Sequence, residues 1–535
     1  MSQPFGLSCK GGLNTNLNQL EMLSQPGFAT QLRNFEVDPD GGYRRINGFE
    51  PFGGASATRP EGTEPILGLQ PYALGVVACA GTSVYYTEDG ISWTQINYNT
   101  GHTGVTQANL SSQTELDRPE QGQAQFVLMK ATEGHATNPY GTLTIVTQGG
   151  DQVAHFHIDG IGATRLFVYE ELTLPVAGTY VEEHDKHLCI VDALNAPNVL
   201  YYSKTNSDRD FTGVGSGAVT FPDKIVGIKS FRNSLFLFCN NSIHKLDNIN
   251  DVTNIQSTQV TRNVGCLSGY SIQEIGGDLV FLSPDGIRTV AGTDRIGDVE
   301  LGSVSRQIQQ LTSELANSIS SYTITSAVLR SKSQYRLFYS LAGESSASAR
   351  GIIGTFTPNG FEWSETLGIQ AFGFVSDFDS THIEKVYHGD KDGYVYLHDT
   401  GNAFNPAGAA QDISAVYQTP NFDFGDIGTR KTVKYVRLSL SPEGVIRPSF
   451  RVRYDYESVD IPQPPDYILN TIPLPSLLGT AVFGIGSFGG TNDPMVRQAV
   501  EGSGNSVSFK IFSVDQNSPY SINGLYIDYM PSGRR

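Results

Sequence analysis

The sequence predicts an all-β protein: a β-propeller of six or seven blades, then a C-terminal β-sandwich, with one short amphipathic helix. Gly and Pro number 58 and 26, and Tyr and Phe number 25 and 28, which favours many short strands joined by tight turns. Groups of strands recur about every 40–50 residues, the period of propeller blades. The last part of the chain alternates polar and apolar residues, as half-buried antiparallel strands do.

Residues 1–53 are expected to form an N-terminal arm that ends in a hairpin. The segment has a weak helical pattern around Leu20, followed by two short strand patterns. Gly41 and Gly42 lie between these strands and supply the backbone freedom that a tight turn needs. The sequence therefore predicts an arm and hairpin ahead of the main body.

Residues 54–420 are expected to form the propeller, because radial repetition of small sheets leaves only short strand edges exposed. The strand groups are 66–96, 124–169, 176–211, one that begins at Ile225, 266–290, 322–363, and a last one that closes with 387–396. The groups share a spacing but no repeated sequence. One or two of them could be insertions, so both six and seven blades stay open.

One helix interrupts this pattern of strands. Apolar residues recur at helical spacing at Val304, Ile308, Leu311, Leu315 and Ile319. Ser303 is the expected cap. The pattern predicts a helix over 304–319 whose single apolar stripe lies against the propeller, most simply as a structural brace.

Residues 421–535 are expected to form the sandwich, which would serve as a docking or platform domain. The loop 460–494 is rich in Pro and Gly and yet apolar, which is unusual for a loop in free solvent. We expect it at a subunit contact or in a channel wall. The candidate contact residues are Pro473, Leu474, Phe483 and Phe488.

The charge is low in density and uneven. Only 17% of residues are charged, against about 25% in typical soluble domains. Residues 421–535 hold 11 basic and 11 acidic side chains, so the net charge of −18 belongs to the first 420 residues. Such a surface would not bind a polyanion by counterion release, which argues against a conventional nucleic-acid-binding domain. It suits a conduit through which DNA slides, and solubility alone is the simpler alternative.

The five cysteines form neither a disulfide framework nor a C-x-x-C pair. Cys79, Cys189 and Cys239 lie inside apolar strand patterns and are expected to be buried free thiols, which favours assembly in a reducing cytoplasm. The N-terminus has no signal-peptide pattern. No apolar run approaches the length of a membrane span.

Two motifs resemble known turn and metal patterns. The segment 87–93, Thr-Glu-Asp-Gly-Ile-Ser-Trp, is similar to the Asp box of sialidase-type propellers, which is a structural turn. Asp390-Lys391-Asp392-Gly393 and Asp38-Pro39-Asp40-Gly41 are faintly like calcium loops, but neither has the glycine and glutamate positions of such a loop. We interpret both as hairpin turns.

Two histidine pairs are the remaining candidates for metal binding. His155 and His157 share one face of a strand, and His184 and His187 flank a turn. Either pair would need a third converging ligand. We interpret all four as polar strand and turn residues, and expect no metal, cofactor or catalytic site.

Basic residues cluster at three places and are the candidates for an assembly interface. They are Arg44, Arg45, Arg430, Lys431, Lys434, Arg437, Arg534 and Arg535. They would contact an acidic neighbouring subunit or DNA phosphates. A solvated face is the alternative interpretation.

Four features occur in a fixed order along the chain. They are a Gly-Tyr-x-Arg-x-x-Gly turn at 42–48, the phrase 279–287 after Gly265-Cys266, the strand 335–339 that follows the helix, and the strand 522–529 before Gly533-Arg534-Arg535. This ordered set resembles the tail nozzle proteins of short-tailed bacteriophages, the tail tubular protein B-like proteins that stabilise packaged DNA. The resemblance implies no catalytic residues.

The resemblance implies a structural virion tail protein and no enzyme. Six copies would form a ring under an adaptor ring, beside tail fibres or spikes, and close the channel around non-specific double-stranded DNA until ejection. Assembly would take place in the host cytoplasm. The alternatives are a propeller-type host-attachment protein that binds or hydrolyses glycans, and a fibre or adaptor component of the same particle.

Overall fold

The computed structural model describes most of the chain. The described residues are 3–23, 25–39, 41–96, 106–107, 122–130, 140–149, 153–160, 166–172, 174, 177–251, 253–290, 303–341, 343–379, 382–469 and 495–534. Among them, no helix is both long enough and apolar enough to cross a bilayer.

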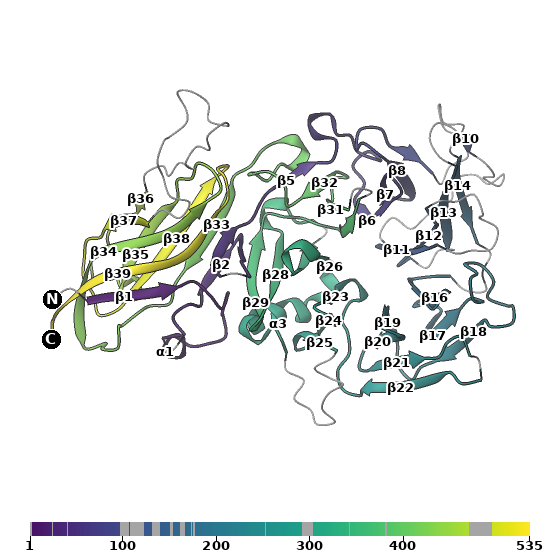
Figure 1. Ribbon diagram of the computed structural model, residues 1–535, viewed down its shortest axis with the longest axis horizontal. Helices are drawn as coiled ribbons and strands as arrows, with labels where there is room; N and C mark the ends of the chain where they lie inside the picture. Colours follow the sequence, from purple (N-terminus) through teal and green to yellow (C-terminus); the bar gives the residue numbers. More distant parts are fainter. Residues whose placement is uncertain are drawn as a thin grey trace.

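In the described residues, seven blades of mainly antiparallel strands form the propeller; six are small separate sheets, and the sixth blade is part of a larger sheet (Figure 1). Blade one is β6–β9 (Ile66–Tyr72, Gly75–Ala80, Ser83–Thr87, Thr94–Gln95), and blade two is β11–β14 (Ala124–Met129, Thr142–Thr147, Ala154–Asp159, Leu166–Glu171) with β10 (Thr106–Gln107) beside β14. Blade three is β15–β18 (Tyr180–His184, His187–Asp192, Ala196–Tyr202, Gly217–Thr220), and blade four is β19–β22 (Ile225–Phe231, Ser234–Cys239, Ile243–Asp247, Gln256–Thr261).

The last three blades follow the same plan. They are β23–β25 (Gln273–Ile275, Asp278–Ser283, Gly286–Thr289), β26–β29 (Tyr322–Leu329, Gln334–Leu341, Arg350–Thr357, Gly360–Leu367) and β30–β32 (Gly373–Phe378, Glu384–Gly389, Val395–His398) with β5 (Phe49–Pro51). Inner strands of successive blades touch, directly or through the short helix η3 (Gly269–Ser271), and β30 touches β6. These contacts close the ring.

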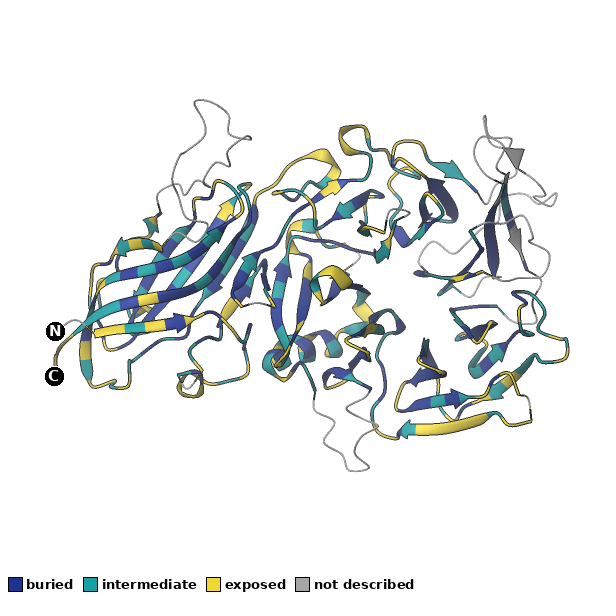
Figure 2. Cartoon of the chain, viewed as in Figure 1, coloured by how far each residue is buried: buried dark blue, intermediate teal, exposed yellow. Residues whose placement is uncertain are grey.

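The closing strand of blade seven comes from the start of the chain. Residues Phe49–Pro51 of β5 pair with Tyr396–His398 of β32, at the edge of the sheet opposite β30. Blade seven therefore contains strands from both the start and the end of the propeller sequence, and their hydrogen bonds close the ring. Figure 2 shows the result of this packing: second strands such as β12, β16 and β20 are buried along their length, while the outermost strand β22 is exposed along most of its length.

The C-terminal lobe is a sandwich of two sheets. One sheet has the order β3-β4-β39-β34-β37, with β1 also paired to β39; its strands are Phe35–Val37, Tyr43–Arg45, Tyr520–Arg534, Thr429–Pro442, Met495–Ala499 and Gln3–Ser8. The facing sheet contains β2 (Gln31–Arg33), β33 (Ile413–Gln418), β38 (Val507–Asp515), β35 (Ser449–Tyr454) and β36 (Tyr467–Ile468).

One sheet runs through both lobes. Strand β2 pairs in parallel with β29 of blade six at Arg33 and Glu365, and antiparallel with β33 of the sandwich. The result is a single nine-stranded sheet. Residues 1–53, which we expected to form an arm with a hairpin, therefore contribute strands to three sheets. The hairpin β3–β4 is present, but it is part of the sandwich.

The predicted helix is shorter than its sequence pattern. The α-helix α3 spans Gln309–Asn317 between two short 3₁₀ turns, and another short helix, α1, spans Gln19–Met22. Ser303 does not cap α3, because its hydroxyl bonds to the carbonyl of Ile287 and to Ser305. Ile308 and Leu315 are buried, and α3 contacts β25, so the helix lies against the propeller as expected.

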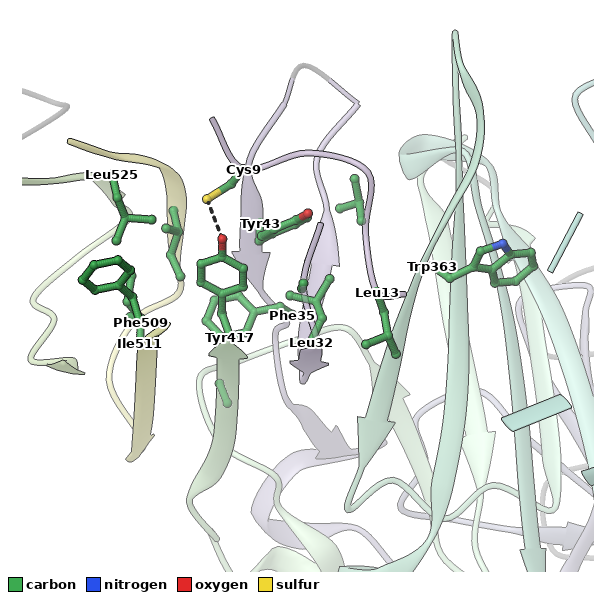
Figure 3. Close-up of a cluster of buried hydrophobic side chains, with 14 of the residues drawn as sticks. Cys9, Leu13, Leu32, Phe35, Tyr43, Trp363, Tyr417, Phe509, Ile511 and Leu525 are labelled. Atoms are coloured by element: carbon green, nitrogen blue, oxygen red, sulfur yellow. Dashed lines mark hydrogen bonds between the residues drawn. The ribbon is translucent and has the colours of Figure 1, made fainter. Parts of the chain in front are cut away.

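The largest hydrophobic core joins the two lobes. It contains sandwich residues such as Phe509 and Leu525, N-terminal residues such as Phe35, and Trp363 of blade six (Figure 3). The Cys9 thiol lies 3.4 Å from the hydroxyl of Tyr417 within it. All five cysteines are free and buried, as predicted for Cys79, Cys189 and Cys239. The lobes therefore share one core as well as one sheet.

Candidate functional site

A buried ionic cluster lies where the sandwich, blade six and blade seven meet. Glu36 of β3 is 3% exposed, and its carboxylate accepts hydrogen bonds from Arg336 (2.8 Å), Lys332 (2.8 Å), Arg44 (2.8 Å) and Gln334 (3.1 Å). Because each of its carboxylate oxygens bonds to more than one donor, Glu36 holds the β3–β4 hairpin against blade six.

Asp399 supplies the second carboxylate of the cluster. It lies 2.7 Å from Lys332 and 3.3 Å from Arg336. Burial alone would raise the pKa of Glu36 and Asp399, but the neighbouring cations outweigh burial and hold both below their usual values. Both groups are therefore ionised at neutral pH, and the cluster consists of paired charges.

Two buried histidines extend the cluster into blade seven. Nε2 of His398 lies 3.0 Å from Arg336, which can only donate, so this nitrogen accepts and Nδ1 of His398 carries the proton. That proton is shared with Nδ1 of His388 at 3.2 Å. Burial lowers the pKa of His388 to about 3, and burial with the neighbouring histidine and Arg336 lowers the pKa of His398 well below its usual value. Both imidazoles are neutral at physiological pH.

The paired arginines of the N-terminal hairpin differ in burial: Arg45 lies inside the molecule, which does not suit an interface residue, whereas Arg44 is partly exposed. Arg45 is fully buried and donates to the carbonyls of Asp515 (2.7 Å) and Asn517. Arg44 pairs with Glu36 and Glu443. Both guanidinium groups connect segments of the same chain, and that of Arg45 is buried too deeply to contact a neighbouring subunit.

The other basic candidates divide into interior and surface positions. Lys431 is 3% exposed and donates to the carbonyls of Asp426 and Asn505. Its buried ammonium does not suit an interface residue. Arg430 is exposed and bonds to Ser503. Lys434 is exposed, and Arg437 pairs with Asp528 at 2.9 Å.

The remaining site predictions lie outside the described side chains. Arg534 ends β39 but its side chain is not described, and Arg535 is outside the described residues. The same holds for the loop candidates Pro473, Leu474, Phe483 and Phe488. These assignments stay predictions.

The propeller axis is crossed by hydrogen bonds between blades that are not neighbours. The side-chain amide of Gln123, just before β11, donates to the carbonyl of Ile324 (2.8 Å) in blade six and of Phe372 (3.3 Å) beside blade seven. The hydroxyl of Tyr270 donates to the carbonyl of Gln123 (2.9 Å). A cavity of about 180 Å³ is left, lined by inner strands of all seven blades.

The Asp box is a structural turn in blade one. The Asp89 carboxylate accepts hydrogen bonds from the backbone N–H groups of Ile91 (2.8 Å) and Ser92 (2.9 Å), which lower its pKa. The Trp93 indole donates to the carbonyl of Thr58 (3.1 Å), so the turn rests on the segment that follows β5. Asp390 closes the β31–β32 hairpin in a similar way, accepting from the N–H groups of Asp392 and Tyr394.

The histidine pairs take part in packing between blades two, three and four. His155 is fully buried, with Nδ1 3.5 Å from Asp208. His184 bonds to Ser230 (2.8 Å), and Nε2 of His187 bonds to Asn250 (2.9 Å). In the part of the chain that the structure describes, no group of three or more His, Cys, Asp or Glu side chains is arranged to hold a metal ion.

Segments of all four family-like features contribute to the same hydrophobic core. Tyr43, Val280, Leu337 and Ile522, one from each feature, are buried members of the core that joins the lobes. The turn of the first feature also needs its last glycine, because a Cβ at Gly48 would lie 1.8 Å from the carbonyl oxygen of Ala403. Each feature therefore contributes a buried residue to the core that joins the sandwich and the propeller.

Sequence reasoning missed the centre of this joint. Lys332, Asp399 and His398 belong to no motif that we recognised, and Arg336 lies in the family-like strand 335–339 without having been considered as a site residue. One signal was available: Arg336 is a charge in the middle of the apolar strand 335–339. A charged residue in such a strand is expected to have a buried partner, but the sequence does not say which one.

Comparison with known proteins does not assign the chain to a family. No protein-family model matches the chain, and no curated protein matches it. Similar solved structures include the extracellular domain of a hybrid two-component system from B. thetaiotaomicron (11% identity, 66% of this chain and 40% of that chain, TM-score 0.36). PorZ of the Porphyromonas gingivalis type-IX secretion system (11%, 64% and 38%, 0.34) and the Neurospora crassa Pan2 WD40 domain (8%, 62% and 88%, 0.34) are others.

The chain spans 40% and 38% of the first two of these proteins. TM-scores this low carry no argument about function. The propeller assignment rests instead on the seven blades and on the contacts that close them into a ring.

Proposed function

We propose that this chain is a structural subunit of a virion tail, a nozzle that retains the packaged genome until ejection. The observation that carries the proposal is the convergence of segments from all four family-like features on the core between the lobes. Features scattered over nearly 500 residues of sequence each contribute to one core. A subunit whose role depends on shape would keep its characteristic residues in such a joint.

The joint makes the two lobes one rigid body. A shared sheet, a shared core and the Glu36 cluster all cross it. Relative motion of the lobes would have to break each of these, and core packing resists continuous deformation. Rigidity suits a ring that has to hold internal pressure and open by movement of whole subunits or of their loops.

The passage for DNA in this proposal lies between subunits and not within one. The bonds of Gln123 and Tyr270 cross the propeller axis, and the cavity there is far too small for a polynucleotide. The acidic charge of the first 420 residues would keep DNA from adhering to the wall of a bore formed by neighbouring copies. Catalysis is not part of the proposed role.

The oligomeric mass of the purified chain tests the proposal. Light scattering and native mass spectrometry should find a closed ring, expected to hold six copies, and electron microscopy should find a central bore. Such rings should also bind the adaptor ring of the tail from the same particle. A chain that stays monomeric at high concentration, alone and with the adaptor, would contradict the proposed function.

A further inference from the structure

The outer face of the sandwich sheet β4-β39-β34-β37 carries an unusual set of exposed side chains. Val436 and Leu438 of β34, and Leu525 and Ile527 of β39, are fully buried in the core. Residues between them therefore point outward, because successive side chains of a strand alternate between faces. The outward residues include Tyr435, Arg437, Tyr526 and Asp528, and strand β37 adds Met495 and Arg497.

The strand register brings these residues side by side. Arg437 lies opposite Arg497 on one side and opposite Tyr526 on the other. Adjacent strands are about 4.8 Å apart, so the three form one continuous row. The Arg497 guanidinium stacks 3.7 Å above the ring of Tyr435. We name Tyr435, Arg437, Met495, Arg497 and Tyr526, with Lys434 at the neighbouring bulge, the Arg–Tyr face.

The composition of the Arg–Tyr face is that of a protein interface. Tyr, Arg and Met are enriched in such interfaces, and Tyr and Arg supply much of their binding energy. Tyr526 and Met495 are 50% and 51% exposed, and the Arg437 side chain is 41% exposed. Large amphipathic side chains held in a flat row are ready to bind with little loss of conformational freedom, since the row lies on a rigid sheet.

The Arg–Tyr face is also cationic in an acidic protein. Lys434, Arg437 and Arg497 provide three positive charges, and Asp528 pairs with Arg437. Neither Lys434 nor Arg497 makes an ion pair within the described residues. Within the described residues these two cations have no acidic partner, whereas the chain as a whole carries −18, all of it in the first 420 residues.

We propose that the Arg–Tyr face docks on the acidic propeller of a second copy of this chain. Charge complementarity selects this occupant, because each copy offers both a cationic sandwich face and an acidic propeller. A contact between different surfaces of identical copies is head-to-tail, and repeats of it close into a ring when the rotation allows. The inference rests on the proposed function and specifies which surfaces make its ring.

Charge reversal of the two unpaired cations in the full-length chain tests this inference. Lys434→Glu with Arg497→Glu leaves the Arg437–Asp528 pair intact. The matched control is Lys10→Glu with Arg447→Glu, two exposed cations away from the face that change the net charge equally. Self-association is measured by sedimentation and native mass spectrometry at low and high salt, and the fold is checked by circular dichroism.

The face variant should weaken self-association at least tenfold relative to wild type and control, and high salt should reduce this difference because it screens the charges. Equal association of the face variant and the control would overturn the inference and leave the proposed ring standing. A monomeric wild type would overturn both. A gel-shift assay with double-stranded DNA tests DNA as the alternative anionic partner of the face. If the face variant loses DNA binding while its self-association is unchanged, the inference would also be overturned.

Discussion

Replacing Glu36 by glutamine should cost about 3–5 kcal/mol of stability, because it removes one partner of a buried ion pair. The carboxylate is 3% exposed and accepts from Arg336, which is 1% exposed, at 2.8 Å. Lys332 and Arg44 share its other oxygen. Glutamine preserves the shape but not the charge, and leaves three cations with Asp399 and Glu443 as their remaining carboxylates.

Urea denaturation followed by tryptophan fluorescence measures the loss, since Trp363 lies in the core that joins the lobes. Glu443→Gln is the matched control. It also pairs with Arg44, but its side chain is 45% exposed, so its loss should cost about 0–1 kcal/mol. Equal effects of the two variants, or a cost for Glu36→Gln below about 1 kcal/mol, would refute the view that burial makes this cluster a structural joint.

Three further perturbations test the joint and the blades. Stability should fall as pH drops below about 6.5, by about 1.4 kcal/mol per pH unit for each of His388 and His398, because these groups take up protons when unfolded but stay neutral when folded. Urea midpoints at several pH values measure this slope, and His388→Gln should flatten it. Phe49→Ala should cost about 3–5 kcal/mol, because this ring is 3% exposed and stacks within blade seven; a cost near zero would argue against β5 as the closing strand. Asp89→Ala should cost about 1–2 kcal/mol in thermal unfolding, through two lost bonds to backbone N–H groups, and should leave self-association unchanged.

Local signals predicted the parts of the fold that depend on neighbours in the sequence. The expected strand groups fall in the observed blades, because alternation and turn residues act within a few positions. Asp89-Gly90 and Asp392-Gly393 form turns as expected, and Gly90 and Gly393 have φ of +71° and +85°. The blade number stayed open between six and seven because one or two strand groups could have been insertions. The last strand of blade seven, β5, was not predicted, since it precedes the first blade in sequence.

The candidate site was predicted less well, since burial of a charge depends on distant partners. Arg44 and Arg45 have the sequence pattern of a surface cluster, yet Arg45 bonds to carbonyls 470 and 472 positions away. The partner of Arg336 is Glu36, 300 positions earlier. A basic pair beside a turn is the same pattern whether it faces solvent or a buried carboxylate.

By itself, the sequence determined an all-β chain, the blade spacing, the tight turns, the buried thiols and the uneven charge. Each of these follows from side-chain chemistry over short distances. Tertiary structure alone decided that β2 and β5 tie the start of the chain into a shared sheet and a closed ring, and that the Glu36 cluster lies between the lobes. Strand pairing and charge burial are set by which distant segments meet, and that depends on packing of the whole molecule.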